Sequence, residues 1–267
     1  MKKQKINLAI KVVSAVVIVV IAATALTAYL WRAFKKSDYF AIKDIVTSQD
    51  TPVDLSYLKG RNIFSVDLEK QARYLSDAYP VYRNIRLIRI LPDRVFVEFV
   101  KRQPVAYIRL YKYFSVDRDC VLFDVLSMPQ EANLPVILGL ETKIFGPKTG
   151  KKFNVKELNF SLDIIKEVRS VRALRYWKIR KIDVTNPDGV SFFIAMPVKN
   201  PSLLPVGAPP VPEILIEIKI NQGGIADKIG ILTGMLFQLK NEWVNIKYID
   251  LRFKEPVVKF KDKNVKR

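Results

Sequence analysis

The sequence predicts an α+β protein with a single N-terminal transmembrane helix and a large folded region behind it. Three observations support this prediction. Residues 12–31 are almost entirely apolar, the next stretch has the order strand, helix, helix, strand, strand, and the remainder is β-rich with inserted helices. An apolar fraction of 49% in 267 residues is enough for a packed core. We therefore expect most of the chain to be folded.

The first element is the membrane helix, predicted over residues 12–31. Residues 12–30 carry no charge, and at about 1.5 Å per residue they span about 28 Å, close to the hydrocarbon thickness of a bilayer. Tyr29 and Trp31 lie at the far end, where aromatic rings favour the headgroup region. Basic residues flank both ends: Lys2, Lys3, Lys5 and Lys11 before, Arg32, Lys35 and Lys36 after.

The flanking charges predict the orientation. With the amino terminus counted, positive charge is slightly greater on the N-terminal side of the helix. Residues 1–11 are therefore predicted to be a cytoplasmic tail, with the helix in the plasma (inner) membrane and the folded region extracytoplasmic. A cleaved signal peptide is the alternative, because Ala23-Thr24-Ala25 offers a small-x-small cleavage pattern. The long apolar run and its aromatic, basic end favour a retained anchor.

The net charge of +19, from 45 basic and 26 acidic residues, favours anionic partners such as lipid headgroups or acidic wall polymer. The basic residues are spread along the chain without a recognisable nucleic-acid-binding motif, so we expect no nucleic-acid partner. If the N-terminal segment were cleaved, a secreted basic wall-binding protein would be an alternative function.

The stretch after the anchor has regular local signals. Ser65 is a candidate cap for a helix that Pro80 ends, and Gly60 suits the turn after a preceding short helix. The expected elements are a strand at 40–46, a short helix at 53–58, a helix from Ser65 to Tyr79, and a hairpin of 85–91 with 94–101.

Motifs in this stretch resemble one known family. They are Gly60-Arg61-Asn62-Ile63-Phe64-Ser65-Val66-Asp67, then Tyr79-Pro80, then Ile90-Leu91-Pro92-Asp93-Arg94-Val95, and Glu98 with Lys101-Arg102-Gln103-Pro104-Val105-Ala106. In order and spacing they resemble the POTRA domain (β-α-α-β-β) of the bitopic bacterial cell-division family FtsQ, called DivIB in Gram-positive bacteria. The likeness continues over 113–123, where Cys120 stands at a position at which Gly is usual, and it implies a POTRA domain over residues 38–107.

The remaining residues predict a β domain over 108–255, followed by a basic C-terminal tail over 256–267. Asn154 is a candidate cap for a helix, and Gly230 and Gly234 are interpreted as sites of close packing. Expected strands are 105–110, 113–117, 121–124, 178–185, 190–195, 213–220 and 246–253, with a helix from Ile225 to Leu239 and an exposed proline-rich loop over 196–212. The strand at 246–253 closely resembles the closing strand of the FtsQ family.

Catalytic chemistry is not predicted. The chain has no His and a single Cys, Cys120, so Ser-His and Cys-His nucleophile arrangements and the commonest transition-metal ligand are excluded. We expect no enzyme activity, cofactor, metal or small-molecule substrate.

Binding is predicted instead, at a C-terminal strand that lies at a sheet edge and can accept a partner's strand. The predicted partner-binding residues are Tyr248, Asp250, Arg252, Phe253, Lys254 and Val257, with residues 254–259 as an extension, whereas Ile249 and Leu251 are expected in the core. The resemblance implies that FtsB/DivIC-like and FtsL-like bitopic proteins and other divisome members bind here, at the division septum. A POTRA-containing accessory of protein secretion or outer-membrane assembly is the alternative, which should show repeated POTRA units or a barrel.

Overall fold

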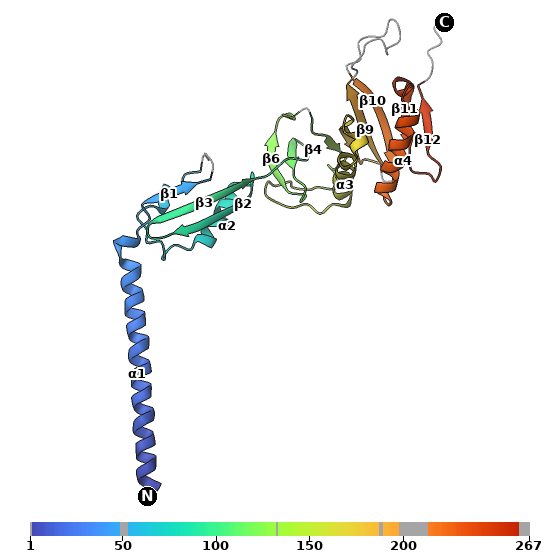
Figure 1. The fold of residues 1–267 in the computed structure, drawn as a ribbon. Coiled ribbons are helices and arrows are strands. Elements are labelled where there is room, and N and C mark those ends of the chain that lie inside the picture. The colour runs from blue at the N-terminus through green and yellow to red at the C-terminus, as the bar shows by residue number, and fades with distance from the viewer. Residues whose placement is uncertain (1, 49–52, 132, 187–188, 198–212, 262–267) are drawn as a thin grey trace, which may run out of the picture. The chain divides into compact units, whose positions relative to one another are not determined.

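The computed structural model describes residues 2–48, 53–131, 133–186, 189–197 and 213–261, without the side chains of residues 2–13 and 35–36. The chain divides into two compact units, Met1–Lys101 and Arg102–Arg267. The mixture of elements within these units confirms the predicted α+β class, with an apolar N-terminal helix and a β-rich body (Figure 1).

The first element is the helix α1 (Lys2–Lys36). Its segment Ser14–Phe34 is long and apolar enough to cross a membrane. The side chains of this segment are not buried against the rest of the protein. Leu26, Leu30 and Trp31 are all more than half exposed. Such a surface suits the interior of a bilayer, where apolar side chains avoid contact with water.

The rest of the first unit is a three-stranded sheet covered on one face by helices. The strands lie in the order β1-β3-β2, with β1 parallel and β2 antiparallel to β3. Val95, Val97 and Phe99 alternate along β3 and pack into a core with Leu58 and Leu75 from the helices. The elements are η1 (Asp38–Phe40), β1 (Asp44–Thr47), η2 (Ser56–Leu58), α2 (Leu68–Ala78), β2 (Tyr82–Ile90) and β3 (Arg94–Lys101). After the additional short helix η1, this order matches the predicted strand, helix, helix, strand, strand, although β1 begins at Asp44 and not at residue 40.

The motif that begins at Gly60 connects this sheet to the end of α1. Gly60 has a left-handed backbone with φ of +78°, and its N–H donates to the carbonyl of Ile42 at 2.9 Å. The Asn62 side chain donates to the carbonyls of Phe34 (3.1 Å) and Ser37 (3.2 Å) and accepts from the N–H of Phe64 (3.0 Å). Rings from both sides meet here: Trp31, Phe34, Phe40 and Phe64 have centroids 4.3–6.2 Å apart. The motif therefore connects the end of α1 to this sheet through side-chain hydrogen bonds and ring contacts.

The second unit contains a sheet of nine strands within its described residues, in the order β12-β11-β10-β9-β8-β7-β4-β5-β6. β7 is parallel to β4 and β8, and β10 is parallel to β11, while the other neighbouring pairs are antiparallel. The strands are β4 (Ala106–Arg109), β5 (Tyr113–Val116), β6 (Leu122–Leu126), β7 (Val136–Leu138), β8 (Lys178–Asp183), β9 (Val190–Pro197), β10 (Glu213–Ile220), β11 (Ile246–Asp250) and β12 (Val257–Phe260).

Two helices, α3 (Lys156–Ser170) and α4 (Ile225–Gln238), share one core with this sheet and contact each other. Ile164 and Ile165 of α3 and Ile229 and Leu232 of α4 are at most 1% exposed. Short helices η3 (Arg172–Leu174) and η5 (Trp243–Asn245) lead into β8 and β11. Trp243 fixes the second of these, because its indole N–H donates to the carbonyl of Leu236 at 2.7 Å.

Several local predictions are wrong. Asp67, not Ser65, caps α2, since its side chain accepts from the N–H of Lys70 at 3.0 Å. α3 begins after Val155 without a side-chain cap, and Asn154 instead accepts from the Asn159 side chain. Gly230 and Gly234 are not closely packed, because a Cβ added at either would meet nothing within 4 Å. In the proline-rich segment, residues 196–197 belong to β9, and residues 198–212 lie outside the described residues.

Cys120 lies in the turn between β5 and β6 and has an unusual backbone conformation. Its φ is +63°, a left-handed conformation in which glycine is the usual residue. Asp117 holds this turn, because its Oδ1 accepts from the N–H groups of Asp119 (2.9 Å) and Val121 (3.0 Å). Asp117 is only 3% exposed, and its other carboxylate oxygen pairs with Arg102 at 2.5 Å. This Asp is therefore part of the buried structure of the turn.

Candidate functional site: the C-terminal edge of the large sheet

Two strands close the C-terminal side of the nine-stranded sheet. β11 pairs parallel with β10, and β12 pairs antiparallel with β11 (Figure 1). The sequence predicted one final strand over residues 246–253 at the edge, which is wrong: β11 ends at Asp250, and β12 covers its outer side. Residues 257–260, assigned from the sequence to a C-terminal tail, form this edge strand. Within the described part of the chain, no strand pairs with the outer side of β12.

The backbone direction of β12 follows from two contacts. The N–H of Lys261 donates to the carbonyl of Asn245 at 2.7 Å, so the residue 261 N–H faces β11. Two residues earlier, Lys259 lies directly opposite Tyr248 of β11. Because backbone groups alternate in direction along a strand, the N–H and C=O of Val258 point to the outer side of the sheet. That edge is therefore able to bond to a further strand.

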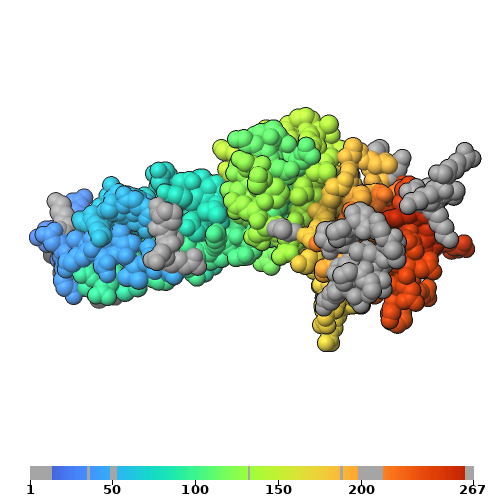
Figure 2. Space-filling view, turned by 90° about the horizontal axis from the view of Figure 1, so that it is seen from above, coloured from blue at the N-terminus to red at the C-terminus, as the bar shows by residue number. Residues whose placement is uncertain are grey.

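The side chains around this edge are apolar and basic. Val257 is 48% exposed and Phe260 is 38% exposed, while Val258 packs against the core of the unit. Lysines at 254, 259 and 261 are exposed around it, and among the described residues 254–261 one, Glu255, is acidic. In Figure 2 the C-terminal residues, in red, lie on the surface of the second unit. The edge suits an extended partner with apolar and acidic side chains.

Asp250 and Arg252 form an ion pair at the turn that leads from β11 to β12. The Arg252 guanidinium donates to both Asp250 carboxylate oxygens, with Nη2 2.7 Å from Oδ2 and Nε 3.0 Å from Oδ1. The Arg252 backbone N–H donates to the same carboxylate at 3.1 Å. Burial acts to raise the pKa of Asp250, but these bonds from Arg252, together with the charge of Lys219, hold it below its ordinary value. Asp250 is 5% exposed, so this pair stabilises the turn from inside the fold.

The turn has further bonds to β10 and to Asn221 directly after it, and Arg252 lies close to Gly189 of the β8–β9 connection. The N–H of Leu251 donates to the carbonyl of Lys219 at 2.8 Å, and the Asn221 side chain donates to the carbonyl of Arg252 at 3.3 Å. Gly189 leaves room for the stem of Arg252, because a Cβ there would lie 3.0 Å from Arg252 Cδ. The path of the chain into β12 is therefore fixed by polar contacts.

The predicted partner-binding residues fall into two groups. Phe253, Lys254 and Val257 are exposed near the edge strand. Asp250 and Arg252 bind each other, and Tyr248 is half-buried, with the Lys219 ammonium 4.1 Å from the centre of its ring. Ile249 and Leu251 are buried, as expected.

Sequence reasoning missed Phe260 and Lys219. The run Val257-Val258-Lys259-Phe260, rich in β-branched and aromatic residues after a proline, is a signal that could have identified the edge strand. Lys219 gives no comparable signal, because its position above Tyr248 depends on the parallel pairing of β10 with β11.

Similarity to known proteins is informative at this point. The chain is 24% identical over 201 residues to the cell division protein FtsQ of Koribacter versatilis, and 23% identical over 237 residues to that of Geotalea daltonii. These matches cover 74% and 86% of the chain, and a third, to FtsQ of Myxococcus fulvus, is 29% identical over 83 residues, 31% of the chain and 29% of that relative. The chain is therefore similar, over most of its length, to proteins named cell division protein FtsQ.

The chain spans about half the length of the first of these relatives, 52%, and 78% of the second. No protein-family model matches it. Because the second match extends over most of the chain, the FtsQ resemblance includes the large sheet as well as the first unit.

Proposed function

We propose that this chain is a non-enzymatic scaffold of the bacterial division machinery that connects bitopic membrane proteins at the septum. Its similarity to proteins named cell division protein FtsQ supports the cell-division role. The helix segment Ser14–Phe34 supports membrane anchoring, and the basic residues that flank it favour a cytoplasmic N-terminus with the folded units outside the cytoplasm.

The partner-binding site in this proposal is the outer side of β12. FtsB/DivIC-like proteins, with FtsL-like proteins beside them, add an extended segment to the backbone groups of Val258. Exposed Phe253, Lys254 and Val257 contact the side chains of that segment. Tyr248, Asp250 and Arg252 act by keeping β11 and the following turn in place. The observation that carries this proposal is a short edge strand whose outer side is open in the described residues.

The first unit has a separate role in this proposal. We assign residues 38–101 as a POTRA domain that, with α1, directs the chain to the division site; it ends before the expected residue 107 because β4 (Ala106–Arg109) belongs to the second unit. The contacts of Asn62 with the end of α1 support this, because they couple the anchor to the domain. A secretion or outer-membrane assembly accessory is less well supported, since the relatives named above are cell division proteins.

Two truncations of the full membrane-anchored chain test the proposal. One ends after Glu255 and removes β12, and the matched control ends after Lys261 and keeps it. Both are co-purified from the native membrane, and small bitopic coiled-coil proteins are identified by mass spectrometry. We expect the control to retain them and the shorter chain to lose them, while urea unfolding shows that its second unit still folds. Equal retention by both would place the binding site elsewhere, and retention by neither the control nor the full chain would contradict the division role.

A further inference from the structure

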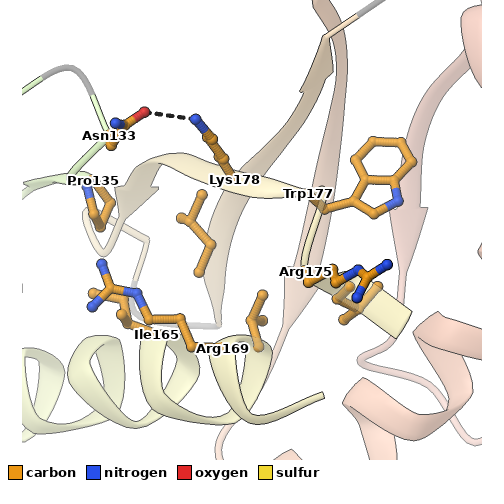
Figure 3. Close-up of a pocket in the computed structure, with 10 residues that line it drawn as sticks. Asn133, Pro135, Ile165, Arg169, Arg175, Trp177 and Lys178 are labelled. Carbon is orange, nitrogen blue, oxygen red and sulfur yellow. Dashed lines mark hydrogen bonds between the residues drawn. The ribbon is translucent and has the colours of Figure 1, made fainter. Parts of the chain in front are cut away.

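The second unit has a cavity of about 260 Å³ at β8, which is four places from β12 in the order of the strands (Figure 3). It is formed by the end of α3, by η3 with the start of β8, and by the segment that precedes β7. The lining residues are Asn133, Pro135, Ile165, Val168, Arg169, Leu174, Arg175, Trp177, Lys178 and Ile179. None of the residues assigned above to partner binding lines it.

The cavity has an apolar base. Ile165, Val168, Leu174, Trp177 and Ile179 belong to the core and are all at most 6% exposed. These side chains are rigidly held, since they pack between α3 and the sheet. A flexible segment that enters the cavity would therefore meet a preformed apolar surface, which lowers the entropic cost of binding.

Three cations surround this base. In Figure 3, Arg169 rises from α3 on one side, Lys178 lies on the opposite side beside Asn133, and Arg175 lies next to Trp177. Each is exposed and donates to a neutral acceptor: Arg169 to the Val105 carbonyl (3.3 Å), Arg175 to the Tyr176 hydroxyl (2.6 Å) and Lys178 to Asn133 Oδ1 (2.7 Å).

No acidic side chain lines the cavity, and none of the ion pairs within the described residues involves Arg169, Arg175 or Lys178. Arg169 is exposed as a residue, but neighbouring atoms remove part of the water around its guanidinium, and this desolvation lowers its pKa. Cations in such a setting bind a carboxylate more strongly than a neutral acceptor, because the two opposite charges also attract each other, and partial desolvation strengthens that attraction. An anion can thus replace the neutral acceptors.

We propose that this cavity binds an acidic peptide segment of a protein partner. A Glu or Asp carboxylate is held between Arg169 and Lys178, and a neighbouring apolar side chain lies on the base beside Trp177. The volume is below the roughly 300–1,000 Å³ of sites that enclose a small molecule, which favours one or two side chains of a larger partner. The apolar base distinguishes this ligand from free phosphate, which would gain nothing from it. The site is independent of β12, so the chain has two binding surfaces.

Fluorescence anisotropy tests this with the full chain in uncharged detergent. The probe is a labelled hexapeptide, acetyl-Ala-Leu-Glu-Phe-Glu-Ala, and its matched control has Gln in place of both Glu residues. We expect saturable binding of the acidic peptide and at least about tenfold weaker binding of the Gln peptide. The triple variant R169Q/R175Q/K178Q should lose at least about tenfold in affinity for the acidic peptide, and K178Q alone should lose part of it.

A second triple variant controls for net charge. K156Q/K166Q/K247Q removes the same charge from exposed positions outside the cavity and should stay within about twofold of the unmodified chain. Equal losses in the two triple variants would mean general attraction and overturn the proposal, as would equal binding of the two peptides. Displacement by inorganic phosphate at the same concentration as unlabelled peptide would identify a simple anion as ligand and would also overturn it. Urea unfolding midpoints equal to that of the unmodified chain would exclude misfolding of the variants as the cause of a lost affinity. K178Q repeats the test with one substitution at an exposed residue.

Discussion

The Asp250–Arg252 pair gives a prediction about stability. Asp250→Asn keeps the shape of the side chain and removes the charge that Arg252 binds through three side-chain contacts of 2.7–3.2 Å. It also weakens the bond from the Arg252 N–H. The turn that leads into β12 should then become less stable, together with the second unit as a whole.

The size of this effect follows from burial. Hydrogen bonds to charged groups contribute about 1.5–3 kcal/mol, and breaking a fully buried pair costs about 3–5 kcal/mol. The Asp250 side chain is 7% exposed, but that of Arg252 is 28% exposed, so Arg252 can recover part of its hydration. We therefore expect a loss of about 1.5–3 kcal/mol in the free energy of unfolding. For a domain of this size, that is a fall of roughly 3–12 °C in Tm.

Urea unfolding of the full chain, followed by the fluorescence of Trp177 and Trp243, measures this loss. The matched control is Asp163→Asn, an exposed carboxylate on α3, which should change stability by less than about 0.5 kcal/mol. Because the folded pKa of Asp250 lies below its ordinary value of 3.8, its contribution is fully present above that pH and disappears as pH falls further. The difference between the two chains should be constant near neutral pH and shrink below about pH 4. A difference under about 0.5 kcal/mol at neutral pH, or one that does not shrink in acid, would refute this reasoning.

Three other predictions concern single side chains. Gly189→Ala should destabilise the second unit by about 1–3 kcal/mol in urea unfolding, because the new Cβ lies 3.0 Å from the Ile220 carbonyl oxygen and 3.0 Å from Arg252 Cδ; an unchanged midpoint would contradict this. Asn62→Ala should increase amide hydrogen exchange over residues 34–40 by about fivefold or more, since each lost hydrogen bond contributes about 1 kcal/mol, and unchanged exchange would mean that Asn62 does not hold α1. Burial raises the pKa of the Cys120 thiol above its ordinary 9.0, so alkylation at neutral pH should be slow in the folded chain and much faster in urea; equal rates would contradict the buried position.

Some of the fold could be predicted from sequence because its signals are local. The strand β10 matches its predicted bounds of 213–220, since alternating isoleucines with polar neighbours define it without help from the rest of the chain. The caps were harder to predict. Ser65 and Asp67 are both good capping residues two positions apart, and the path of the chain after Ile63, fixed by Arg89 from β2, decides between them.

The candidate site could be predicted only in part, for a physical reason. Alternation of Tyr248, Asp250 and Arg252 with apolar residues indicates a single strand with an open polar face. In the structure the chain leaves the sheet after Asp250, and Arg252 turns back to bind it. This depends on the space that Gly189 leaves more than 60 residues earlier in the sequence, which no local pattern records. The edge strand itself is only four residues long, too short for a clear periodic signal.

The central claim is that partners bind the outer backbone of β12, and one substitution tests it directly. Val258→Pro removes an N–H that points away from β11, so the pairing of β12 with β11 should survive, as proline is tolerated on the open side of an edge strand. The matched control Val258→Ala shortens the side chain and keeps the N–H. Affinity of the full chain for an FtsB/DivIC-like protein from the same organism is measured in detergent. We expect Val258→Ala to bind within about threefold of the unmodified chain and Val258→Pro to bind about 2- to 13-fold more weakly than Val258→Ala, the equivalent of one lost hydrogen bond of about 0.5–1.5 kcal/mol. Equal affinities for the two variants, with both folded, would contradict binding by strand addition at this edge.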